Sequence, residues 1–288
     1  MLNSEFNVKT YAKLNLSLLV YQARPDKYHP ICSIFQNISL ADNLKITIIK
    51  PKELILSSDN TTLPLDQTNI LSKVFDQVKE KLDYGFKIHL QKEIPLGGGL
   101  GGGSTNAAGF ISFLNEIMRL DFTKEALTKL ALNTGADVTF FLLGKGTALV
   151  SGIGEIVEPI SKGKTNYFLL INPKIEIPTK FIYQKFDELK NIQKFKKIPI
   201  YLRTKLIGTN SLSSVVFASY PKMKQLKEQI TSFGLKLFLS GSGATCFIPF
   251  KNQQKALYWE SKIKEMFPDY FIRLTTSKTE SHIISAIN

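Results

Sequence analysis

Residues 95–105 read Pro-Leu-Gly-Gly-Gly-Leu-Gly-Gly-Gly-Ser-Thr, with six glycines in eleven positions. The alternating run Phe86–Ile94 predicts a strand before this stretch, and apolar periodicity between residues 110 and 118 predicts a helix after it. A glycine turn that feeds a helix N-terminus exposes backbone N–H groups at the positive end of the helix dipole, which suits a phosphate group. A flexible linker is the alternative, and the close framing by a strand and a helix disfavours it.

Two common phosphate loops fit this stretch poorly. A Walker A loop needs a Lys before its final Ser or Thr, but Ser104 follows Gly103 directly. A dinucleotide-binding pattern can be threaded through Gly97, Gly99 and Gly102, yet so many glycines make that match nearly automatic. The acidic residue expected at the end of a second strand is also lacking, because Asp121 falls between two helical patterns.

Three motifs, taken in order, carry a resemblance that spans residues 10–250. They are Pro95 to Ala108, Gly135-Ala136-Asp137-Val138 and Ser240-Gly241-Ser242-Gly243-Ala244. Together they resemble the GHMP small-molecule kinases, and the long glycine loop is similar to that of the branch acting on a cytidine diphosphate alcohol of the isoprenoid pathway. The resemblance implies ATP-dependent phosphorylation of a hydroxyl of that alcohol with Mg²⁺, whose ligands stay unknown. It implies that the ATP-binding residues are Pro95, Gly97, Gly98, Gly99, Leu100, Gly101, Gly102, Gly103, Ser104 and Thr105.

Two residues are candidates for catalysis. By itself Asp137 is typical of a turn, but the resemblance implies that it is the catalytic Asp, which can take the proton from an attacking hydroxyl. The segment Ala12–Leu18 alternates strictly, so Lys13, Asn15 and Ser17 share one face of a predicted strand. That face fits an ordinary half-solvated strand or a polar cleft. The resemblance implies a catalytic role for Lys13 beside Asp137 and substrate binding by Asn15.

The resemblance also predicts how the acceptor is recognised. It implies a cytidine contact by Tyr28 and His29, a Thr contact with an aromatic that stacks on cytosine, and a motif that closes over the reacting groups. These later residues are Thr179, Tyr183, Ser240, Gly241, Ser242 and Gly243. The chain departs from the family at Lys27 and Pro30, where Gly and Glu are common, and at Ser211 and Ser213, where carboxylates are common. We expect the Ser211 hydroxyl to cap a helix in place of an Asp.

Composition limits the class of protein. The chain has 288 residues, 43% of them hydrophobic, which predicts a globular protein with room for two modest domains. No apolar run approaches the length of a membrane span, and the N-terminus gives no sign of export. Two cysteines and three scattered histidines predict neither a disulfide framework nor a zinc site, and we expect a cytoplasmic protein.

The net charge of +13 invites a nucleic-acid partner, but the lysines are spread without interleaved aromatics. A positive field also suits a phosphorylated small substrate. We therefore expect ATP and a small cytidine diphosphate alcohol as partners, no nucleic acid or membrane, and a monomer or weak homodimer.

The order of predicted elements indicates an α+β protein in two parts, residues 1–162 and 163–288. The resemblance implies a ribosomal-protein-like N-terminal domain and a ferredoxin-like C-terminal domain. We predict β structure across residues 138–157 and a single helix over residues 213–233. Two other functions stay open. One is a GHMP kinase acting on mevalonate, homoserine or a sugar, and the other is a catalytically silent nucleotide- or RNA-binding protein. Lys13 with Asp137 favours a kinase, and Tyr28-His29 with Tyr183 favours a cytidine substrate.

Overall fold

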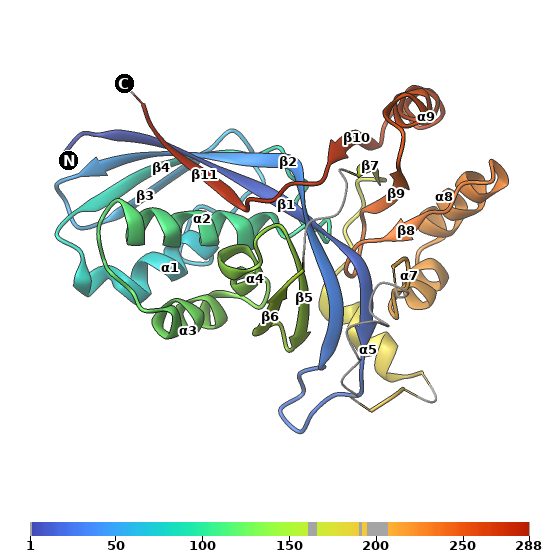
Figure 1. Cartoon of the computed structure of the whole chain (residues 1–288), viewed down its shortest axis with the longest axis horizontal. Coiled ribbons are helices and arrows are strands. Elements are labelled where there is room, and N and C mark those ends of the chain that lie inside the picture. The colour runs from blue at the N-terminus through green and yellow to red at the C-terminus, as the bar shows by residue number, and fades with distance from the viewer. Residues whose placement is uncertain (1, 161–165, 190–191, 195–206, 288) are drawn as a thin grey trace.

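Two long antiparallel strands, β1 (Glu5–Val20) and β2 (Ile31–Ile49), extend from one lobe of the molecule toward the other (Figure 1). The structure, a computed structural model, describes residues 2–160, 166–189, 192–194 and 207–287. The pairing of β1 with β2 is irregular between Tyr11 and Lys13 and again between Asn15 and Ser17. Such irregularities bend strands and re-aim side chains, and they lie here where β1 leaves the first lobe.

The first lobe is one sheet covered by helices. Within the described residues, seven strands form the sheet in the order β11-β1-β2-β4-β3, with β5 beside β2 and β6 beside β5. Helices α1 to α4 lie on one side of this sheet (Figure 1), and apolar side chains of both fill the core between them. The further elements are β3 (Leu54–Ser58), α1 (Ile70–Val78), a 3-10 turn (Lys79–Lys81), β4 (Gly85–Gln91), α2 (Gly102–Glu116), α3 (Lys124–Thr134), α4 (Val138–Leu143), β5 (Thr147–Gly152), β6 (Ile156–Pro159) and β11 (His282–Ile287).

The second lobe has an antiparallel sheet of its own. Its described strands run in the order β10-β7-β9-β8, and helices pack around them. The two lobes share a core in which Leu14 and Leu16 of β1 meet Phe168, Leu170 and Phe247 of the second sheet. The elements are β7 (Tyr167–Asn172), α5 (Thr179–Asp187), α7 (Ser213–Ser219), α8 (Pro221–Ser232), β8 (Phe238–Leu239), β9 (Cys246–Phe250), α9 (Gln253–Met266) and β10 (Phe271–Thr276).

Residues 138–143 differ from prediction, because they form helix α4 rather than a strand. The run Val-Thr-Phe-Phe-Leu-Leu is apolar except for Thr139, and periodicity cannot tell a buried helix from a buried strand in so short a run. The β structure predicted farther along is present as β5 and β6. The helix has a consequence for the site, since it places Asp137 at its N-terminal end.

The single helix predicted over residues 213–233 is also wrong, because α7 and α8 are separate helices. Tyr220 between them is extended, with φ −123° and ψ 101°. The cause is Pro221, which disfavours helical backbone in the residue before it and begins α8 as its first residue.

The two-part α+β arrangement is confirmed, with one exception at the C-terminal end. Strand β11 pairs with β1 in the first sheet, although it lies beyond the predicted boundary near residue 162. The boundary itself falls in residues 161–165, outside the described part of the chain, and stays a prediction. Among the described residues, no helix has the length and apolar character needed to cross a membrane.

Candidate active site

A cleft of about 740 Å³ lies where β1, the glycine loop, α5 and the turn after β8 meet. Eleven of the residues predicted to act at the site line it: Lys13, Asn15, Tyr28, His29, Gly99, Gly101, Asp137, Thr179, Tyr183, Gly241 and Ser242. These residues come from distant parts of the sequence and from both lobes. The structure therefore gathers the three motifs and the aromatic residues around one cavity.

Lys13 and Asp137 form an ion pair inside the cleft. Lys13 Nζ lies 3.2 Å from Asp137 Oδ2, with the lysine side chain 4% exposed and the aspartate side chain 29% exposed. The ammonium also donates to Asn15 Oδ1 at 2.6 Å and lies 4.7 Å from the centre of the Phe35 ring. These contacts hold a buried positive charge against a carboxylate that still reaches the cavity. An ionised carboxylate in such a position can accept a proton from a hydroxyl.

Strand β1 orients the lysine through the residues around it. Asn15 Nδ2 donates to Ser33 Oγ on β2 at 3.0 Å, which turns its carbonyl oxygen toward Lys13. Ser17, predicted on the same polar face, does not line the cleft. Its hydroxyl instead accepts from the Ile34 backbone N–H at 3.1 Å, beside the strand irregularity. The alternation therefore placed Lys13 and Asn15 correctly on one face of the strand, but it did not hold for Ser17.

The glycine loop is anchored by its carbonyl groups. The carbonyls of Gly98, Gly99 and Leu100 accept hydrogen bonds from Thr245 N, Ser240 Oγ and Lys13 N, at 3.2, 3.0 and 2.9 Å. Helix α2 begins immediately after the loop, and the first N–H groups of an α-helix have no acceptor within it. The anchored loop and the open helix end together provide backbone donors for a phosphate.

Two glycines of the loop are required by space and conformation. Gly99 and Gly101 both have φ +71°, in the left-handed region. A Cβ on Gly99 would lie 2.3 Å from the Ser240 carbonyl oxygen, and one on Gly101 would lie 2.9 Å from the Phe141 ring. The loop therefore packs directly against the second lobe and against α4.

The turn of residues 240–243 closes one side of the cleft. Ser242 Oγ and Thr179 Oγ1 are 2.8 Å apart, so the turn is joined to the start of α5. Asn210 holds the turn from behind, since its side-chain amide donates to the Gly241 carbonyl at 2.8 Å and to the Leu239 carbonyl at 3.0 Å. Ser240 and Gly243 support the turn and lie outside the lining of the cleft.

The far end of the cleft is aromatic. The rings of His29 and Tyr183 lie 5.0 Å apart, and His29 Nε2 contacts Asp187 Oδ1 at 2.7 Å. Burial, together with the nearby charge of Asp137, raises the pKa of Tyr183 to about 12, so its phenol is neutral at physiological pH. Tyr28 is 61% exposed at the rim. This end offers ring faces on which a flat base can stack, and polar groups that can bond to the edge of the base.

Sequence reasoning missed three contributors, namely Phe35, Ser33 and Asp187. A signal existed for Asp187, which lies four residues after Tyr183 and hence on the same helix face.

The expected Ser211 cap is wrong. The Ser211 hydroxyl accepts from Val20 N at 3.1 Å, and α7 has no side-chain cap. The tertiary contact takes the hydroxyl away from its own helix.

Predicted ATP-binding residues outside the lining lie beside the cleft, on the loop and the first turn of α2. They are Pro95, Gly97, Gly98, Leu100, Gly102, Gly103, Ser104 and Thr105. Lys27 has φ +67°, a backbone conformation that favours glycine, at the position where the family commonly has Gly.

Comparison with known proteins identifies the family of this chain. Residues 69–145 match the family model for the GHMP kinases N terminal domain, and residues 200–269 match the model for GHMP kinases C terminal. A 4-diphosphocytidyl-2-C-methyl-D-erythritol kinase of Thermoanaerobacter pseudethanolicus is 37% identical over 286 residues, covering 95% of this chain and 97% of the relative. The kinase of that name from Lachnoclostridium phytofermentans is 34% identical over 271 residues, covering 89% and 92%.

Solved structures give the same result. A 4-(cytidine 5'-diphospho)-2C-methyl-D-erythritol kinase superposes with a TM-score of 0.76 at 25% identity, covering 94% of this chain and 99% of the other. Homoserine kinase from Cytophaga hutchinsonii superposes with a TM-score of 0.69 at 18% identity, covering 98% and 97%, and this likeness concerns the fold alone. The predicted two-domain fold is confirmed.

Proposed function

This chain belongs to the GHMP kinases, and within them to the 4-diphosphocytidyl-2-C-methyl-D-erythritol kinases. We propose that its cleft binds ATP and the cytidine diphosphate alcohol side by side, with Asp137 as the catalytic base. The enzyme transfers the γ-phosphoryl group of ATP to a hydroxyl of 4-diphosphocytidyl-2-C-methyl-D-erythritol. The observation that carries the catalytic assignment is the Lys13–Asp137 pair, which lies between the glycine loop and the aromatic end of the cleft.

The reaction follows from these positions. The acceptor hydroxyl oxygen attacks the γ-phosphorus, its proton passes to the Asp137 carboxylate, and the bond to the β-phosphate oxygen breaks to release ADP. Lys13 keeps the carboxylate oriented and offsets negative charge near the attacking oxygen. The glycine loop and the first turn of α2 bind the phosphates through backbone N–H groups. Most of the remaining catalysis is positioning of the two substrates.

Magnesium fits this site as a companion of ATP. Among the described residues there is no group of three His, Cys, Asp or Glu side chains that could hold a metal ion. Mg²⁺ commonly keeps several waters and binds through substrate phosphates with one or two protein oxygens, so such a cluster is not required. When bound, the ion neutralises charge on the phosphate oxygens.

The aromatic end of the cleft is the proposed cytosine subsite. Tyr183 and His29 offer ring faces, and Asp187 orients the imidazole. Tyr28, at the rim, covers the base once it is bound. A cytidine acceptor gives the rings of His29 and Tyr183 in the cleft a flat partner on which to stack.

One assay tests the substrate assignment. Formation of ADP is measured with a panel of acceptors: the cytidine diphosphate alcohol, its free alcohol, mevalonate, homoserine and a simple sugar. We expect turnover with the cytidine compound alone. Preferred turnover of a small acceptor without a cytosine would contradict the subsite. Failure of every acceptor, with ATP still bound, would favour the silent nucleotide-binding alternative.

We also propose that the enzyme acts as a monomer or weak homodimer on small molecules, without nucleic acid or membrane. Residues of one chain line the cleft on all the sides described above. Gel filtration with light scattering tests the oligomeric state. A cytoplasmic location stays a prediction from cysteine content.

A further inference from the structure

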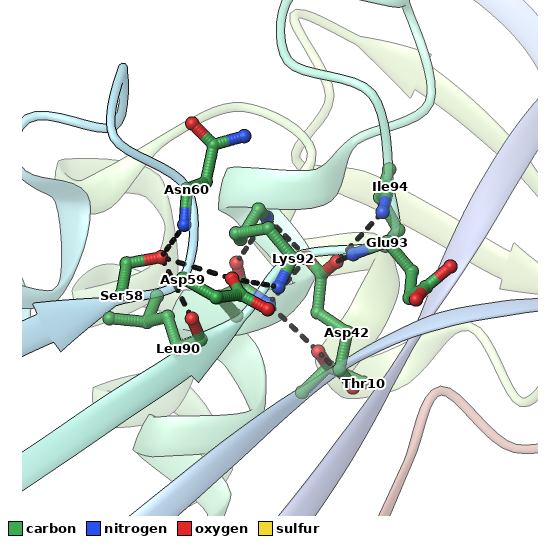
Figure 2. Close-up of polar contacts among 10 residues, drawn as sticks. Thr10, Asp42, Ser58, Asp59, Asn60, Leu90, Lys92, Glu93 and Ile94 are labelled. Carbon is green, nitrogen blue, oxygen red and sulfur yellow. Dashed lines mark hydrogen bonds and ion pairs between the residues drawn. The ribbon is translucent and has the colours of Figure 1, made fainter. Parts of the chain in front are cut away.

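A buried ion pair lies just outside the cleft, and the reaction as described above does not use it. Asp42 on β2 pairs with Lys92, which follows the last residue of β4, and their side chains are 0% and 2% exposed. Figure 2 shows the Asp42 carboxylate facing Lys92 on one side and the backbone of Glu93 and Ile94 on the other. No motif in the sequence singled out either residue of this pair.

The Asp42 carboxylate uses both of its oxygens. Oδ1 accepts from the backbone N–H groups of Glu93 and Ile94, each at 2.9 Å. Oδ2 accepts from Lys92 Nζ and from Asn106 Nδ2, the latter at 3.1 Å. Asn106 Oδ1 in turn accepts from Lys92 Nζ at 3.0 Å. A single carboxylate thus organises a closed network.

This network joins the two ends of the glycine loop. Ile94 lies immediately before Pro95, where the loop begins, and Asn106 lies in the early part of α2, five residues after Gly101, where the loop ends. A second carboxylate, that of Asp59, accepts from Lys92 N at 2.9 Å (Figure 2). The backbone N–H groups of the three residues that follow β4 therefore all donate to carboxylates.

This buried ion pair differs from a contact that only stabilises the fold. Burying two charges carries a desolvation penalty, and apolar residues of similar volume often stabilise a fold at least as well. A glycine-rich segment also has more backbone freedom to lose than any other. Fixing both of its ends to one rigid point removes much of that freedom before ATP binds, which is pre-organisation.

We propose that Asp42 is a positioning residue for the phosphate loop, acting through Lys92 and Asn106 to hold both ends of the loop in the ATP-binding geometry. The proposal rests on the proposed function only in taking the loop as the ATP site. Asp42 does not touch substrate. It sets the angle between the end of β4 and the first turn of α2, and hence the direction of the N–H groups that meet the phosphates.

The test compares Asp42→Asn with Ile263→Ala, which opens a cavity in the core of the second lobe, far from the loop. Asp42→Asn removes the charge and leaves side-chain volume nearly unchanged. We expect kcat/KM for ATP to fall about 10- to 100-fold in Asp42→Asn, because small displacements of a bound group cost that much. The KM for the acceptor should stay unchanged. Ile263→Ala should lower Tm and leave both KM values unchanged.

A second measurement needs no kinase reaction. Hydrogen–deuterium exchange over residues 92–106 should be about tenfold faster in Asp42→Asn than in wild type, with no change in Ile263→Ala. If Asp42→Asn does not fold, Lys92→Met replaces it, since it keeps the Asp42 bonds to Glu93, Ile94 and Asn106. That variant should show the same ATP-specific defect, reduced to about threefold.

The outcomes are distinct. Wild-type ATP binding by calorimetry and wild-type loop exchange in folded Asp42→Asn would overturn the positioning role. A defect that appears equally in ATP and acceptor KM would also overturn it. Failure of wild-type enzyme to phosphorylate the cytidine alcohol would instead contradict the proposed substrate, and calorimetry with exchange would still decide the role of Asp42.

Discussion

Replacing Asp137 by Asn removes the proposed base while nearly preserving the shape of its side chain. Asp137 makes no capping bond to α4, so the helix does not depend on its carboxylate. Lys13 keeps its hydrogen bond to Asn15 at 2.6 Å and its contact with Phe35 at 4.7 Å. We therefore expect Asp137→Asn to fold and to bind ATP as the wild type does.

The magnitude follows from the geometry. At the observed 3.2 Å the gross Coulomb attraction is roughly 5 kcal/mol for an effective dielectric constant of about 20. Solvent reaches the carboxylate, which is 29% exposed, so the net loss of unfolding free energy should be about 1 kcal/mol. The loss of a general base costs about 10²–10⁴ in kcat, or roughly 3–5 kcal/mol of activation free energy. Catalysis should thus suffer much more than stability.

The assay measures kcat by ADP formation at saturating ATP and acceptor, with Tm from calorimetry and ATP affinity from titration. Asp76→Asn on the exposed side of α1 is the matched control, because it makes the same chemical change far from the cleft. A folded Asp137→Asn enzyme whose kcat stays within about tenfold of wild type would refute the base assignment.

Further changes test other parts of the site. Gly101→Val should abolish measurable ATP binding in calorimetry, because its backbone has φ +71° and a Cβ would lie 2.9 Å from a phenyl ring; unchanged affinity in a folded variant would contradict the loop assignment. Tyr183→Ala and His29→Ala should each raise the acceptor KM by roughly 5- to 150-fold and leave the ATP KM unaltered, as expected for loss of base stacking. The pKa of Tyr183 is raised to about 12 in the folded state from 10.0, so its contribution to stability should be complete below pH 10 and lost as pH rises toward 12. Denaturant titration of wild type and Tyr183→Phe across that range measures this, and identical pH dependence would argue against it. Ser211→Ala should lower the unfolding free energy by about 1 kcal/mol, because the Val20 N–H loses its acceptor, while kcat stays unchanged; a large fall in kcat at normal Tm would place Ser211 in the active site.

The sequence pattern was sufficient to predict features that are encoded within one short segment of the chain. The glycine loop between Phe86–Ile94 and the helix after it was recognisable because glycine content and apolar periodicity are properties of neighbouring residues. The alternation of Ala12–Leu18 likewise indicated which face holds Lys13 and Asn15. The roles of Asp137 and Tyr183 depended on the family resemblance, since an Asp in a turn or a Tyr in a helix carries no chemistry by itself.

The sequence by itself determined a two-part α+β protein with a phosphate loop, because the signals for those features are short in range, and its resemblance to the GHMP kinases implied the reaction. Only the tertiary structure decided that Lys13 lies 3.2 Å from Asp137. It alone decided that Asp42, on the neighbouring strand, accepts hydrogen bonds from residues on both sides of the loop. It also decided that residues 138–143 are helical, since packing and not periodicity sets the conformation of a short, mostly apolar run. Contacts between segments far apart in the chain depend on how sheets pack and where strands bend, and no local pattern encodes them.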